Sequence, residues 1–196
     1  MPTASVAAAR RVSEIAVVWT LAASTLAIVL GIVDASVALL AFGAVGCVDA
    51  AGSIALVHHF RHAQKHAELE DRFERRAHTI VAFGLLSVGT AAIVVGIVKL
   101  GDSSDASVAA IVLAAVSLVV LSALSARKVW VGRRVPSAAL VADGHLSMVG
   151  ALQALVTLAG VLVPSIDATA AIVVGAIAVG LGVKARRDLA PSVRGS

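Results

Sequence analysis

The chain has 196 residues, of which 59% are hydrophobic, 14% charged and 3% aromatic. A soluble domain carries about 25% charged residues, so this composition excludes an ordinary water-soluble globular protein. The formal charge of +4 does not indicate a nucleic-acid partner, because aromatic side chains for base stacking are scarce and the basic residues stand only between apolar runs. Cys47 is the only cysteine, which excludes an intrachain disulfide bond and a multi-cysteine zinc site.

Six apolar segments follow one another along the chain, each close to the roughly 20 residues that a helix needs to cross a bilayer. We therefore predict an all-α fold, a six-helix transmembrane bundle. The first segment follows Arg10 and Arg11 as a signal-peptide core would, but Glu14 and Trp19 at its start favour a retained helix. The predicted spans are 15–33, 35–57, 80–100, 108–126, 138–163 and 166–183.

The positions of lysine and arginine predict the orientation. All of them except Lys99 precede the first span, lie in the second or fourth connection, or follow the last span, and Lys128 is counted in the fourth connection. Short cytoplasmic loops carry the positive excess, so both termini are predicted to be cytoplasmic. We expect a multi-pass protein of the cell membrane, with the lipid bilayer as its surroundings. Its predicted parts are a cytoplasmic segment 1–14, a membrane domain 15–183 with a cytoplasmic, histidine-bearing loop 58–79, and a tail 184–196.

Few ionisable residues fall inside the predicted spans, where each costs about 2.5–3.5 kcal/mol on insertion. Asp49 lies eight residues from the cytoplasmic end of the second span, and His145 lies equally deep in the fifth. A carboxylate and an imidazole at one depth form a half-site for a divalent cation such as Zn²⁺. Asp143, two residues before His145, falls on nearly the opposite face of its helix and is a candidate gate or relay.

Two serines accompany these acids at helical spacing. Ser53 and Ser147 follow Asp49 and Asp143 by four residues, so each shares a helix face with its acid and offers a hydroxyl oxygen to a cation or a water. The alternative is an interhelical hydrogen bond, Asp to Ser or Asp to His, that only holds helices together. The sequence leaves both interpretations open. The glycines of the spans indicate close helix packing.

The connection after the second span carries a histidine stripe. His62, His66 and Glu70 recur every four residues and would line one face of a helix that extends beyond the bilayer. Histidines at this spacing can hold a metal from one face, which suggests a cytoplasmic capture site. The alternative is a solvated linker stabilised by pairs of opposite charge.

The sequence shows no motif that is typical of an enzyme. It contains no nucleophile elbow, phosphate loop or HExxH motif. We therefore expect neither an enzyme nor an organic cofactor.

Three stretches together resemble the cation diffusion facilitator superfamily, in its compact branch without a large cytosolic domain, which includes vertebrate zinc-binding vesicle proteins. They are 42–61, FGAVGCVDAAGSIALVHHFR; 139–155, ALVADGHLSMVGALQAL; and 167–191, DATAAIVVGAIAVGLGVKARRDLAP. The resemblance implies export of a divalent metal cation, Zn²⁺ first, by proton antiport. It leaves room for a homodimer held by helix contacts.

The resemblance also implies a ligand set. Asp49 matches the second acid of the family's pair on the second helix, whereas the position of the first acid holds Val45. On the fifth helix the family's histidine and final acid correspond to Leu146 and Gly150, and His145 stands one residue away. The alternative function is a membrane interaction protein that keeps this fold without transporting.

Overall fold

The computed structural model describes residues 3–33, 37–66, 71–98, 107–162 and 164–189, and almost all of these residues are helical. The helices are α1 (Thr3–Val33), α2 (Val37–His66), α3 (Asp71–Val98), α4 (Val108–Arg134), α5 (Ala138–Leu162) and α6 (Pro164–Leu189). The all-α expectation is confirmed for this part of the chain.

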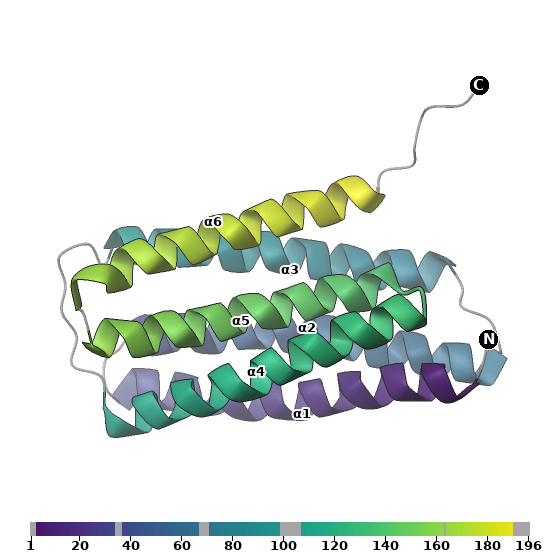
Figure 1. Cartoon of the computed structure of the whole chain (residues 1–196), viewed down its shortest axis with the longest axis horizontal. Helices are drawn as coiled ribbons and strands as arrows, with labels where there is room; N and C mark the ends of the chain where they lie inside the picture. The colour runs from purple at the N-terminus through teal and green to yellow at the C-terminus, as the bar shows by residue number, and fades with distance from the viewer. Residues whose placement is uncertain (1–2, 34–36, 67–70, 99–106, 163, 190–196) are drawn as a thin grey trace.

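The helices form an elongated bundle in which successive helices run in opposite directions (Figure 1). The end of α2, the turn from α4 to α5 and the end of α6 lie at the end where α1 begins. We call this the basic end, because it carries Arg10, Arg61, Arg133 and Arg186. The closest partners are α1 with α2, α3 with α6, and α4 with α5; α2 and α5 also contact each other and α3.

The surface of the bundle is apolar. Among the described residues, four helical segments are long and apolar enough to cross a membrane: Ser5–Val33, Glu74–Val98, Val108–Arg134 and Ala138–Ala159. Large side chains such as Val18 and Val119 are 71% and 68% exposed, which suits contact with lipid. These features are those of an integral membrane protein.

The helices extend beyond the predicted spans at the basic end. The predicted loop 58–79 is largely helical, because α2 continues to His66 and α3 begins at Asp71. The assignment of Lys128 to a connection is wrong: α4 continues to Arg134, and Lys128 is fully buried within it. Counting charges along the chain misplaced Lys128, because its neutralising carboxylates are supplied by other helices.

Two glycines allow α3 and α6 to approach each other closely. A Cβ atom at Gly89 would lie 2.7 Å from the carbonyl oxygen of Gly175, and one at Gly175 would lie 2.6 Å from the carbonyl oxygen of Gly89. Backbone atoms of packed helices cannot move aside as a flexible side chain can. Glycine is therefore required at this crossing, as the packing interpretation of the sequence expects.

Gly89→Ala should lower the free energy of unfolding by about 1–3 kcal/mol, because the added methyl group forces α3 and α6 apart. Titration of the detergent-solubilised protein with SDS, followed by circular dichroism, measures this change. Gly180→Ala is the matched control, since a Cβ there has no neighbour within 4 Å. Equal losses in the two variants would contradict the close-approach argument.

Candidate functional site: a buried lysine between two aspartates

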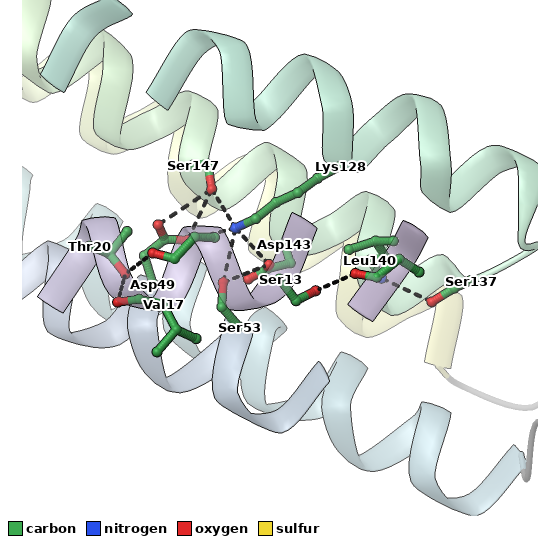
Figure 2. Close-up of polar contacts among 12 residues, drawn as sticks. Ser13, Val17, Thr20, Asp49, Ser53, Lys128, Ser137, Leu140, Asp143 and Ser147 are labelled. Carbon is green, nitrogen blue, oxygen red and sulfur yellow. Dashed lines mark hydrogen bonds and ion pairs between the residues drawn. The ribbon is translucent and has the colours of Figure 1, made fainter. Parts of the chain in front are cut away.

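A single ammonium group lies at the meeting point of three helices. Lys128 of α4 extends toward Asp49 of α2 and Asp143 of α5 (Figure 2). Its Nζ lies 2.7 Å from Asp143 Oδ2 and 3.6 Å from Asp49 Oδ1. The exposed fractions are 0% for Lys128 and Asp143 and 3% for Asp49, so all three charges are removed from solvent.

Two serines complete a directed hydrogen-bond network. Lys128 Nζ donates to Ser147 Oγ at 2.7 Å and to Ser53 Oγ at 3.0 Å. Ser53 Oγ donates to Asp143 Oδ2 at 3.0 Å, and Ser147 Oγ donates to Asp49 Oδ1 at 3.1 Å. With Asp143 Oδ2, the three N–H bonds of the ammonium have three acceptors, so its hydrogen-bonding capacity is filled.

The network carries an unbalanced charge. One ammonium and two carboxylates sum to about −1 when all are ionised. Asp143 Oδ1 is buried and has no hydrogen-bond partner. It faces Gly52, where a Cβ atom would lie 2.8 Å from that oxygen. The site therefore offers a carboxylate oxygen and a negative charge to one further proton or cation.

A pocket reaches Asp49 from the side facing away from the basic end. Its wall includes Trp19 and Ser24 of α1, Phe42 of α2, Leu121 of α4 and Gly150 of α5. Trp19 Nε1 is buried and has no hydrogen-bond partner. On the other side of Asp49, Lys128 fills the space between the helices. Asp49 thus lies between this pocket and Lys128.

The structure brings together some of the predicted site residues and separates others. Asp49, Asp143 and the two serines form one network, whereas His145 makes no hydrogen bond or ion pair with either acid among the described residues. His145 is half-buried and lies within electrostatic range of Lys184 and Arg133. Equal depth did not place it beside Asp49, because it occupies another face of α5.

The histidine stripe is described only in part. His62 lines a pocket at the basic end. His66 is the last residue of α2, but its side chain, like the whole of Glu70, lies outside the described residues. The cytoplasmic capture site remains a prediction.

Sequence reasoning missed Lys128. Ser117, Leu121 and Leu124 are buried on α4, and Lys128 continues that face at helical spacing. Arg127, one residue earlier, is exposed. The structure, and no pattern in the sequence, shows that the buried stripe of α4 extends past the predicted end of the span to Lys128.

A second polar contact anchors the helices nearer the basic end. Glu74 of α3 accepts hydrogen bonds from Ser137 Oγ at 2.9 Å and from the backbone N–H of Ala139 at 2.8 Å. His59 Nε2 of α2 lies 3.0 Å from the same carboxylate. Ser137 Oγ in turn accepts from the backbone N–H of Leu140 and caps α5. Glu74 thereby ties α2, α3 and α5 together.

Comparison with known proteins finds no matching family model and no matching curated sequence. Within the described part of the chain, no group of three or more His, Cys, Asp or Glu side chains is arranged to hold a metal ion. The candidate site is therefore defined by its own geometry, an ammonium between two carboxylates.

Lys128→Met should lower the free energy of unfolding by about 3–5 kcal/mol, because two buried carboxylates lose their counter-charge. Adding Asp143→Asn should recover most of that loss, since the uncompensated charge is then reduced. SDS titration of the single and double variants measures the coupling. Arg127→Gln is the control and should change stability by less than about 0.5 kcal/mol. Additive losses from the Lys128 and Asp143 substitutions would contradict the ion-pair account.

Proposed function

We propose that this chain is a membrane transporter that exports a divalent cation in exchange for protons, and that Lys128 occupies the cation site in the resting state. In this proposal six helices span the cell membrane and the basic end faces the cytoplasm. The sequence resemblance to cation diffusion facilitators supports the same reaction.

The observation that carries the proposal is the charge balance around Lys128. Two buried carboxylates from different helices surround one ammonium, which leaves a charge of about −1. A buried charge of this kind is costly unless a mobile cation or proton compensates it. A divalent cation that displaces one proton from Lys128 would neutralise the two carboxylates.

The types of oxygen atom at the site indicate which class of cation it suits. Asp49, Asp143, Ser53 and Ser147 supply carboxylate and hydroxyl oxygens, which suit hard ions such as Mg²⁺ and Mn²⁺. The resemblance favours Zn²⁺, for which His145 is the expected nitrogen ligand. Transport of Zn²⁺ with His145 as a ligand requires α5 to rotate, whereas a hard ion requires only that the ammonium withdraw.

The second candidate is a membrane interaction protein in which the same network only fixes the helices. The complete set of acceptors around Lys128 favours it, because a saturated ammonium needs no further ligand. The two candidates differ in whether a cation exchanges with the lysine proton.

Cation flux into proteoliposomes tests the proposal. With a fluorescent indicator inside and an imposed pH gradient, the wild-type protein should transport at least one of Zn²⁺, Mn²⁺ and Mg²⁺. Asp49→Asn should reduce the flux at least about tenfold, which corresponds to about 1.4 kcal/mol of lost cation binding. His145→Gln separates the ions: it should spare flux of a hard ion and reduce that of Zn²⁺. If well-folded wild-type protein shows no flux of any of the three ions, the membrane interaction protein is the better account.

Proton release on cation binding tests the role of Lys128. Calorimetry in buffers of different ionisation enthalpy should show that Lys128→Met releases about one proton fewer per cation than wild type, because the displaced ammonium proton is gone. The cation should also bind more tightly, since its competitor has been removed. Equal proton release by the two proteins would rule out Lys128 as the proton carrier.

A further inference from the structure

A second pocket lies at the basic end, between α1 and α2 and apart from the lysine network. Its lining residues are Arg10, His58, Arg61, His62 and Gln64. We call it the basic-end pocket. Apart from the predicted capture role of His62, the proposed transport reaction assigns no role to it.

Side-chain contacts hold its two arginines in place. Arg61 Nη2 donates to Glu14 Oε1 at 3.0 Å, and Arg10 Nε lies 3.3 Å from the same oxygen. Arg10 Nη1 donates to Gln64 Oε1 at 2.8 Å. One carboxylate shared by two guanidinium groups leaves the pocket with a net positive charge. The arginine side chains are still 37% and 60% exposed, so part of each guanidinium faces outward.

The predicted spans place the pocket at the level of lipid headgroups. Arg10 precedes the predicted start of the first span by five residues, and Arg61 follows the predicted end of the second by four. At 1.5 Å per residue the predicted span ends put both about 6–8 Å outside the hydrocarbon, and Arg10 stands near the start of the apolar segment Ser5–Val33 of α1. Basic pockets between helices at this level bind phosphate-bearing headgroups, because the guanidinium fork matches two phosphate oxygens.

We propose that the basic-end pocket binds a phosphate group, that of an anionic lipid headgroup, through Arg10 and Arg61. A pair of arginines repels a metal cation, so His62 stands in surroundings that favour an anion. Free phosphate has the same chemistry, but the depth of the pocket brings it beside the headgroups of the surrounding bilayer. The proposal is independent of whether the chain transports, because binding alone tests it.

Native mass spectrometry of the full chain in detergent tests this proposal with phosphatidylglycerol, phosphatidylcholine and inorganic phosphate as probes. Wild-type protein should retain phosphatidylglycerol in preference to phosphatidylcholine. Arg61→Gln should weaken that binding about fivefold, the share of one arginine in attracting an anionic lipid. Arg127→Gln, which removes an exposed charge at the same end of the bundle, should weaken it less than about twofold.

Competition identifies the source of the phosphate. If millimolar inorganic phosphate displaces the lipid, the pocket recognises phosphate itself; if it does not, the pocket recognises a lipid phosphate. Both outcomes support a phosphate site. Equal effects of Arg61→Gln and Arg127→Gln, or no preference for phosphatidylglycerol in the wild type, would overturn it.

Glu14→Gln distinguishes a lipid-binding pocket from a structural clasp, by which we mean an ion-pair contact that only holds α1 to α2. Removing the carboxylate that competes for the arginines should strengthen phosphatidylglycerol binding about fivefold, because one negative charge leaves the pocket. A clasp without a ligand predicts a lower melting temperature and unchanged lipid binding, and that result would overturn the proposal.

Discussion

The burial of one ammonium group constrains the centre of this bundle. Moving a charged amine out of water costs several kcal/mol even after relaxation, so Lys128 is tolerated only where other helices bring acceptors to it. The two helices that supply these acceptors, α2 and α5, each carry an aspartate followed four residues later by a serine. The serines bond across: Ser53 of α2 donates to Asp143 of α5, and Ser147 of α5 donates to Asp49 of α2. Changing the register of either helix by one residue would break the crossed pattern, so the network fixes α2, α4 and α5 relative to one another.

The rest of the bundle surrounds the site unequally on its two sides. Toward the basic end, Glu74 joins three helices through Ser137, Ala139 and His59, and the helix ends carry arginines. Toward the opposite end, Asp49 borders a pocket whose wall includes an unpartnered Trp19 nitrogen. The network is therefore bounded by polar contacts on one side and by a pocket with mostly apolar walls on the other.

Hydropathy and helical spacing predicted much of this arrangement. Runs of about 20 apolar residues located the helices, and spacing by four paired each aspartate with its serine on one face. Depth counted from the predicted span ends was a poor guide: it pairs Asp49 with His145, whereas in the structure Ser147 of α5 bonds to Asp49. Lys128 was misplaced for a related reason. Its partners stand 79 and 15 residues away in sequence, so no local pattern records that its charge is neutralised, and the rule that basic residues mark loops placed it outside the membrane.

The charge of the network decides how the site can act. Had Lys128 faced a single aspartate, the pair would have been neutral and its simplest role structural. The second aspartate brings the sum to about −1 when all three groups are ionised, and the proposed function assigns the compensating positive charge to a proton or a cation. Replacing the ammonium proton by a divalent ion changes the charge of the site from about −1 to zero, because the lysine becomes neutral as the ion arrives. In the proposed transport reaction, proton release and cation binding are thus two sides of one electrostatic exchange, and this exchange does not require a histidine.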